Sequence, residues 1–201
     1  MESLSGRMDD FTRKTNLISE DIVYLGLHPN PPHTPTKKLP SLYPVIEHLY
    51  FHIPFCPKAC PYCCFYFEEG SKNKTTAFLD ALLQEVHLAS SRHHIQPKTL
   101  YFGGGTPTSL RVEQLAYLLD GLKQRINLAS VEEWTFEANP ATLRSEKAAL
   151  LRESGVTRIS LGVQSWNPKT LKTLGRAHSP EQADESLQTV RKADFPSVSI
   201  D

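Results

Sequence analysis

Four cysteines lie within nine consecutive positions of this 201-residue chain, and they are all the cysteines it has. Cys56, Cys60 and Cys63 follow the spacing Cys-x3-Cys-x2-Cys, and Cys64 comes directly after the third. Thiols grouped in this way are typical of metal-binding or catalytic sites, whereas incidental buried thiols would be scattered along the chain. The sequence therefore predicts chemistry at this segment.

The segment favours chelation by three thiolates. Prolines at 54, 57 and 61 stiffen it, so little chain entropy is left to lose when a metal binds. Structural zinc usually takes four protein ligands, commonly from two separated pairs, and no second pair follows downstream. Cys64 would point away from its neighbour Cys63 in an extended loop, which leaves one coordination position open. A cubane [4Fe-4S] cluster held in this way has one iron free, while zinc or a plain cluster remains an alternative.

Other residues with chemical potential follow predicted strands. The run "GGGTP" (residues 103–107) lacks the Gly-Lys-Ser/Thr ending of a phosphate loop and the Gly-x-Gly-x-x-Gly pattern of dinucleotide sites. Its glycines would let the backbone approach a ligand, or they form a simple tight turn. Glu137 would accept hydrogen bonds from ribose hydroxyls, or it is a helix cap or a surface charge. Gln164 also follows a strand.

The elements that position these residues alternate between strands and helices. Apolar periodicity predicts strands at 45–53, 98–102, 133–138, 158–163 and 197–201, and helices at 75–90, 112–125, 145–153 and within 168–193. This alternation predicts an α/β fold with a parallel sheet, in which sites lie at the carboxyl ends of the strands. Residues 1–45 hold a proline-rich stretch and are expected to form an N-terminal extension, with the core at 46–201.

Composition narrows the class of protein. The chain carries 22 basic and 22 acidic residues, which argues against nucleic-acid binding by a basic surface. It has no apolar run long enough to span a membrane and no apolar signal-peptide core near Met1. We therefore expect a cytoplasmic protein, and in that compartment the cysteines stay reduced.

The cysteine spacing, with Tyr62 directly before the third cysteine, resembles that of radical S-adenosylmethionine (SAM) enzymes. Further segments resemble the oxygen-independent coproporphyrinogen III oxidase group: "LYFHIPFC", "YFGGGTP", "FEANP", "RISLGVQSWN" and "LGRAHS". These segments run in order through residues 49–201. The resemblance implies a partial (β/α) TIM-like barrel, cut after about its fifth strand.

The resemblance also implies roles for individual residues. Cys56, Cys60 and Cys63 would ligate a [4Fe-4S] cluster, and the open iron would take the methionine part of SAM, whose cleavage gives a 5'-deoxyadenosyl radical. The residues at matching positions that contact SAM or lie near substrate are Tyr50, Tyr62, Gly104, Gly105, Thr106, Glu137, Gln164, Arg176 and Asp201. Without the resemblance, the two tyrosines would be assigned to the core and Arg176 to a helix end.

Two branches of this group differ in function. The oxidase carries a further cysteine two positions after the third, where this chain has Phe65, and "EANP", "GVQSWN" and "GRAHS" are more similar to the heme chaperone branch. Heme binding and transfer is therefore the first expectation, oxidative decarboxylation of coproporphyrinogen III the second, and a non-catalytic metal-binding fragment the third. Cys64 departs from both branches, and the heme ligand stays open among eight histidines.

The resemblance extends to partners and completeness. It implies a porphyrin or heme ligand, an electron donor protein and a heme acceptor protein. The family barrel continues past a strand like "SVSID", so we expect this chain to hold an incomplete core that binds a cluster without turnover.

Overall fold

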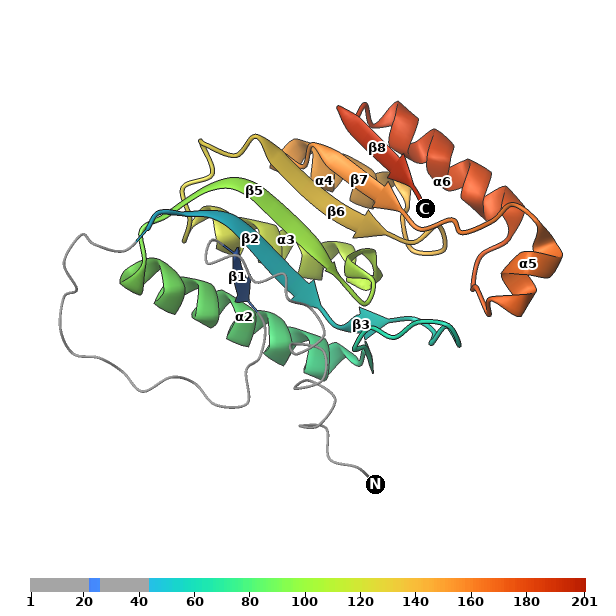
Figure 1. Cartoon of the computed structure of the whole chain (residues 1–201), viewed down its shortest axis with the longest axis horizontal. Helices are drawn as coiled ribbons and strands as arrows, with labels where there is room; N and C mark the ends of the chain where they lie inside the picture. Colours follow the sequence, from blue (N-terminus) through green and yellow to red (C-terminus); the bar gives the residue numbers. More distant parts are fainter. Residues whose placement is uncertain (1–21, 26–43) are drawn as a thin grey trace, which may run out of the picture.

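The computed structural model describes residues 22–25 and 44–201, and its centre is a six-stranded sheet in which every pair of neighbouring strands is parallel (Figure 1). The strands follow one another across the sheet in chain order, which is the arrangement produced by successive strand-helix units. They are β1 (Ile22–Leu25), β2 (Ile46–Ile53), β5 (Ile95–Gly104), β6 (Glu133–Ala138), β7 (Arg158–Leu161) and β8 (Ser197–Ile200).

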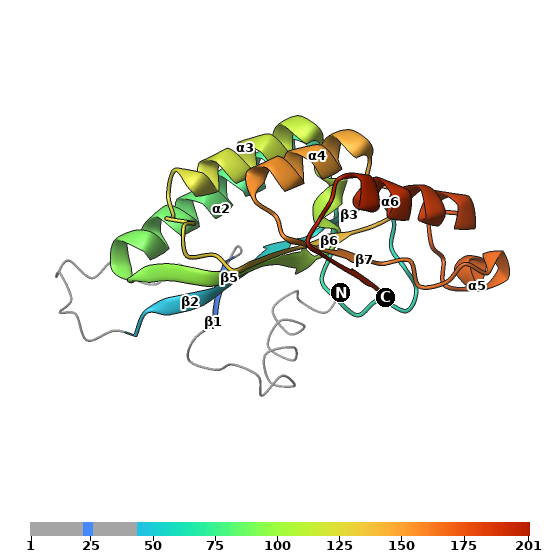
Figure 2. The same ribbon diagram turned by 90° about the horizontal axis from the view of Figure 1, so that it is seen from above.

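The helices of the described chain gather on one face of the sheet, as Figure 2 shows for α2, α3, α4 and α6. The short α5 lies beyond the carboxyl end of β7. The helical elements are α2 (Lys72–Arg92), the 3-10 turn η1 (Pro107–Ser109), α3 (Val112–Lys123), α4 (Ser145–Ser154), α5 (Pro168–Thr173) and α6 (Pro180–Lys192). Among residues 22–25 and 44–201, no helix covers the other face of the sheet.

The two faces of the sheet differ in chemistry because alternate side chains of a strand point to opposite sides. Toward the helices, Phe51, Phe102 and Phe136 stack in a row, with ring centroids 4.4 and 4.8 Å apart, and all three are fully buried. On the open face, His48 Nδ1 lies 2.8 Å from Thr99 Oγ1, and Glu133 pairs with an arginine of β7 at 3.4 Å. The apolar face forms the core, and the polar face carries the hydrogen-bonding side chains.

The cysteine segment departs from the main sheet through a separate pair of short strands. β3 (Phe55–Cys56) pairs in parallel with β4 (Glu68–Glu69), and these strands bracket the intervening loop. The loop therefore begins and ends at the carboxyl edge of the main sheet, directly after β2.

The predicted α/β fold is confirmed, with differences at the element ends. β5 begins three residues earlier than predicted and runs through Gly104, because Gly103 and Gly104 continue the ladder with β2. β7 ends at Leu161, two residues early, where the backbone turns toward Gln164.

Strand β1 was not predicted, and it pairs with β2 from within the proposed N-terminal extension. Residues 1–21 and 26–43 of that extension lie outside the described residues. No helix in the part of the chain that the structure describes is long and apolar enough to cross a membrane.

Candidate metal centre

The four thiols of the cysteine loop differ in their exposure to solvent. Cys56, Cys60 and Cys63 are half-buried, whereas Cys64 is exposed, and a turn joins Cys63 N to the carbonyl of Cys60 at 3.0 Å. Burial raises the pKa of the Cys56 thiol, and the thiols of Cys63 and Cys60 raise it further because they lie within range of its charge. Cys64 thus differs from the other three cysteines in its exposure.

The glycine run holds the start of this loop in place. Gly105 N donates to the carbonyl of Ile53 at 2.9 Å, and Thr106 N donates to the carbonyl of Phe55 at 2.8 Å. The hydroxyl of the buried Thr106 lies 3.3 Å from Cys56 Sγ, a contact that lowers the pKa of this thiol. Residues 103–107 therefore act as a backbone support for the first cysteine.

Two of these glycines are required by the protein's own packing. A Cβ on Gly105 would lie 2.8 Å from the carbonyl carbon and oxygen of Pro54, which are backbone atoms that cannot swing away. Gly104 has a φ of 106°, and a Cβ there would lie 2.6 Å from the ring of His52. Close approach of β5 to the segment after β2 thus depends on glycine at both positions.

Arg176 attaches the middle of the cysteine loop to the sheet. Gly175 lies two residues after the end of α5 and has a φ of 66°. A Cβ on Gly175 would lie 2.7 Å from Pro61 of the loop. The Arg176 guanidinium, which follows, donates from Nη1 to Tyr62 Oη at 3.2 Å and to Cys60 Sγ at 3.6 Å, and from Nη2 to the carbonyl of Gly162. The Arg176 side chain therefore joins the cysteine loop to the segment that directly follows β7.

A second group of site residues surrounds Glu137 at the end of β6. Tyr101 donates its hydroxyl to Glu137 Oε1 at 2.7 Å, and the backbone N–H of Gly104 also donates to this carboxylate. Burial raises the pKa of Glu137, and the charge of Asp201 raises it further, while the two hydrogen bonds oppose the shift. The Tyr50 ring stacks on Tyr101 with centroids 5.9 Å apart. A carboxylate held in this way keeps lone pairs for a ligand's hydroxyl groups.

Gln164 and Asp201 meet through their backbones beside this group. Gln164 N donates to the carbonyl of Asp201 at 2.7 Å, and Gln164 has a φ of 68°, in the left-handed region that a non-glycine residue seldom adopts. Such strained residues cluster at ligand sites, which is consistent with the role expected for Gln164.

The predicted site residues thus fall into two groups. The cysteine loop, Thr106, Tyr62 and Arg176 form one, and Tyr50, Gly104, Glu137 and Asp201 form the other. The run from Gly104 to Thr106 connects them. Tyr62 is 47% exposed, so it is not the core residue that its aromatic ring alone suggested.

Sequence reasoning missed three neighbours that shape the site. Tyr101 orients Glu137, His52 lies against Gly104, and Gly162 supplies the carbonyl that holds Arg176. The alternation of β5 could have revealed Tyr101, since it lies on the face opposite Phe102. Nothing in the sequence near Gly162 indicates a long-range partner.

The donor set fits a cluster better than a single metal ion. Among residues 22–25 and 44–201, no three His, Cys, Asp or Glu side chains converge closely enough to hold one ion. Tetrahedral zinc needs four ligands within about 2.3 Å of one ion. A [4Fe-4S] cluster instead distributes its thiolates over different irons, and N–H donors to its sulfurs are common. Three half-buried thiols, with Arg176 donating to one of them, match the second case.

Comparison with known proteins gives the same family as the cysteine spacing. The sequence profile described as "Radical SAM superfamily" matches residues 50–201. The heme chaperone HemW of Lactococcus lactis is 40% identical over 152 residues, which cover 76% of this chain and 39% of that protein. The oxygen-independent coproporphyrinogen-III oxidase-like protein HemZ of Bacillus subtilis is 34% identical. That alignment covers 81% of this chain and 34% of that protein.

Among solved structures, coproporphyrinogen III oxidase (HemN) from Escherichia coli aligns with a TM-score of 0.70 and 30% identity. The alignment covers 78% of this chain and 36% of that one. This similarity confirms the predicted partial barrel of the radical SAM type. The chain spans about two fifths of the length of the curated heme chaperone relatives it matches.

Proposed function

This chain belongs to the radical SAM superfamily, and on that premise we propose that Cys56, Cys60 and Cys63 hold a [4Fe-4S] cluster beside a SAM site. The observation that carries the proposal is the attachment of the cysteine loop at two points, through Thr106 to Cys56 and through Arg176 to Cys60. The burial of the thiols supports the same choice of ligands, because Cys56, Cys60 and Cys63 are half-buried and Cys64 is exposed.

The chain's own residues would then divide the work. Thr106 and Arg176 fix two of the sulfur atoms, and Arg176 adds an N–H donor that disperses thiolate charge. Glu137, oriented by Tyr101 and Gly104, accepts hydrogen bonds from the hydroxyl groups of a nucleoside. Tyr50, Tyr62, Gly105, Gln164 and Asp201 complete the proposed SAM contacts. When bound, the cluster supplies the electron for reductive cleavage of the sulfonium.

For the whole protein we propose heme binding and transfer, in the cytoplasm, with an electron donor protein and a heme acceptor protein as partners. The proposal is supported by the relatives named heme chaperone and by Phe65, which stands where the oxidase branch has a cysteine. Residues 46–201 would form the radical SAM core. Residues 1–45 would form an extension that adds β1 to its sheet.

Coproporphyrinogen III oxidation is the second candidate, favoured by the structural match to HemN and by the name of HemZ. The two functions differ in whether the substrate's propionates are decarboxylated. Hemin titration followed by absorption spectroscopy, and a decarboxylation assay by mass spectrometry, separate them. A Soret band at about one heme per chain without decarboxylation supports the chaperone. Decarboxylation at many turnovers per chain overturns it.

The cluster ligands are tested by replacing each cysteine with serine. After anaerobic reconstitution with iron and sulfide, we expect about four irons in the parent chain and a large loss in Cys56→Ser, Cys60→Ser and Cys63→Ser. Cys64→Ser is the matched control, because its thiol is exposed and outside the group. An equal loss of iron in all four variants would contradict the assignment.

A further inference from the structure

His178 lies in the segment between α5 and α6 and is only 4% exposed. Its Nε2 lies 3.0 Å from the carbonyl oxygen of Val163, and because a carbonyl oxygen only accepts, Nε2 carries the proton. Nδ1 is buried and has no hydrogen-bond partner among the described residues. Burial and the charge of Arg176 both lower the pKa of this imidazole, which favours the neutral ring. His178 therefore acts as a fixed donor to one backbone carbonyl.

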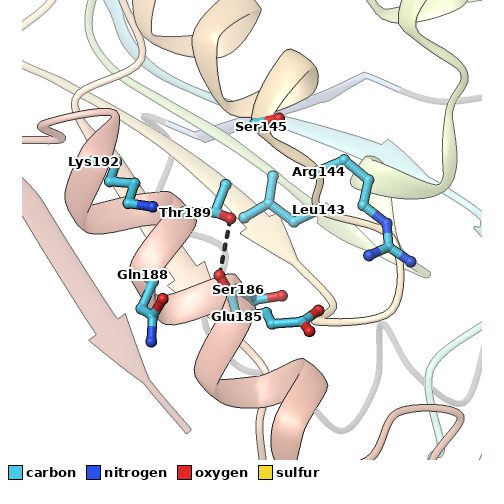
Figure 3. Close-up of a pocket in the computed structure, with 8 residues that line it drawn as sticks. All are labelled: Leu143, Arg144, Ser145, Glu185, Ser186, Gln188, Thr189 and Lys192. Carbon is cyan, nitrogen blue, oxygen red and sulfur yellow. Dashed lines mark hydrogen bonds between the residues drawn. The ribbon is translucent and has the colours of Figure 1, made fainter.

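The unpaired Nδ1 indicates that this position requires the hydrogen bond of an imidazole and not its volume. An apolar side chain would fill the same space without burying a nitrogen that lacks a partner, which is unfavourable. Two hydroxyls of α6 are instead paired by backbone, in the groove between α4 and α6 (Figure 3). Ser186 donates to the carbonyl of Pro140 at 2.9 Å. Thr189 donates to the carbonyl of Glu185, also at 2.9 Å.

His178 and Arg176 hold two consecutive carbonyls of the segment that follows β7. Arg176 Nη2 donates to the carbonyl of Gly162, and His178 Nε2 donates to the carbonyl of Val163. Ala177, which lies between the two donors, is exposed, as expected when alternate side chains point to opposite sides. Both donors thus come from one side of a single segment.

Helix ends fix the segment from which these two side chains extend. Arg176 N donates to the carbonyl of Leu171 at 2.9 Å, at the end of α5. Ser179 is the N-cap of α6, where its side chain accepts from Gln182 N and its own N–H donates to Gln182 Oε1 at 3.0 Å. This capping box satisfies two backbone donors and orders the chain at the start of the helix. The segment is therefore a rigid base for the two donors.

The peptide group between Val163 and Gln164 is held at both of its polar atoms. Its carbonyl accepts from His178, and its N–H donates to the carbonyl of Asp201 at 2.7 Å. Because a peptide group is planar, these two bonds fix its orientation. Gln164 comes directly after it and has a φ of 68°, a conformation that a non-glycine residue keeps only when its surroundings impose it. The Gln164 side chain is exposed, so a ligand can reach it.

We propose that His178 is a positioning residue: by fixing the peptide group before Gln164, it sets the direction of the Gln164 side chain at the proposed SAM site. The effect on SAM rests on the proposed function, whereas the effect on Gln164 does not. Loss of the hydrogen bond would let the peptide group rotate and Gln164 leave the left-handed region. The Gln164 amide would then occupy its SAM contact for less of the time.

The first measurement is hydrogen exchange, followed by mass spectrometry, of the reconstituted 201-residue chain. In His178→Leu we expect exchange at residues 162–166 to become about two- to tenfold faster, the factor that corresponds to one lost hydrogen bond. His178→Gln should restore the slow exchange, because the glutamine Nε2 can donate from the position of the imidazole Nε2. His178→Asn is too short to reach it and should resemble His178→Leu. Circular dichroism checks that every variant is folded.

The second measurement is the SAM affinity of the same variants, followed by electron paramagnetic resonance of the reduced cluster. We expect the affinity to fall about two- to tenfold in His178→Leu and to recover in His178→Gln, with the iron content unchanged. A merely structural role would instead lower iron content and SAM binding together. His87→Leu is the control, because His87 is exposed on α2, and it should change neither measurement.

The proposal is overturned if exchange at residues 162–166 is the same in His178→Leu as in the parent, or if His178→Gln restores nothing. It is also overturned if exchange accelerates while SAM affinity stays unchanged, since Gln164 would then move without consequence. If the parent chain binds no SAM, the proposed function fails, and hydrogen exchange alone decides whether His178 holds Gln164.

Discussion

The group around Glu137 and the cysteine loop are both parts of one site, but they are held in different ways. Glu137, Tyr101 and Tyr50 stand on strands of a continuous parallel ladder, whose other face is the buried aromatic core. The cysteine loop has only the two-residue strands β3 and β4 at its ends, and its aromatic residues Tyr62 and Phe65 are 47% and 53% exposed.

This difference indicates which part of the site exists before cofactors bind. The strand group has its hydrogen bonds in place, so it is preorganised for a ligand with hydroxyl groups. The loop relies on a few contacts from Thr106 and Arg176, and metal coordination would supply the remaining order. Changes at the contacts that hold the loop should therefore have larger effects than changes within the strand group.

The largest effect on stability is expected for Gly105→Ala. The new methyl group would meet the backbone of Pro54 at 2.8 Å, so β5 and the loop entrance must separate. Overpacking of this kind costs about 1–3 kcal/mol of unfolding free energy, measured by urea denaturation. Gly162→Ala is the control, because its nearest contact would be an ordinary 3.5 Å. Equal stability of the two variants would contradict the packing argument.

Arg176→Met is expected to loosen the loop while the strand group stays intact. It removes the donors to Cys60 Sγ, Tyr62 Oη and the Gly162 carbonyl. A hydrogen bond from a charged group contributes about 1.5–3 kcal/mol to stability when it is buried, and less at this half-exposed position. Hydrogen exchange of residues 57–67 should accelerate, with little change in β6. Arg191→Met is the control, because Arg191 is exposed on α6. It should leave hydrogen exchange unchanged both in residues 57–67 and in β6. Faster exchange in β6 would show that the two groups are not separable.

Tyr101→Phe should affect the strand group alone. Loss of the hydrogen bond to Glu137 costs about 0.5–1.5 kcal/mol, and it moves the pKa of Glu137 further upward because this bond lowers it. Carbon-13 NMR of labelled glutamate measures the shift. Tyr117→Phe loses a bond of the same length to Asp80 on the exposed surface, and should leave the Glu137 pKa unmoved. An unchanged Glu137 pKa in Tyr101→Phe would contradict the assigned contact.

The smallest effect concerns pH. Burial raises the folded pKa of Glu137 above its unfolded value, so the stability it contributes is fully present below the usual carboxyl pKa and is lost as pH rises through the folded pKa. Urea denaturation from about pH 4 to 7 should show this fall in the parent chain and less of it in Glu137→Gln, which cannot ionise. A steeper fall in Glu137→Gln would contradict the direction of the shift.

Glu137 and the three proposed cysteine ligands were predicted from the sequence for different reasons, whereas Tyr101 was missed. Apolar periodicity located the five main strands, so the convergence of Glu137 and the glycines at their carboxyl ends followed from topology alone. The choice of Cys56, Cys60 and Cys63 over Cys64 followed from their spacing, and it stays a prediction. By contrast, the bonds of Arg176 to Cys60 and Gly162 depend on how α5 ends and folds back, and no local pattern encodes that.

Strand β1 was missed because Ile22–Leu25 is short and lies in a region whose composition argued for extended chain. The contact between Tyr101 and Glu137 could not be predicted from either residue alone, since it joins two different strands. Period and spacing thus locate elements and ligands, while tertiary contacts decide which polar atoms are paired.

The most direct test of the central claim is electron paramagnetic resonance of the reconstituted, reduced chain with and without SAM. A [4Fe-4S] cluster whose other three irons are held by Cys56, Cys60 and Cys63 has one open iron, and it predicts a signal that changes when SAM is added and that Cys64→Ser retains. A signal that does not respond to SAM, or stoichiometric zinc in place of a cluster, would contradict the account.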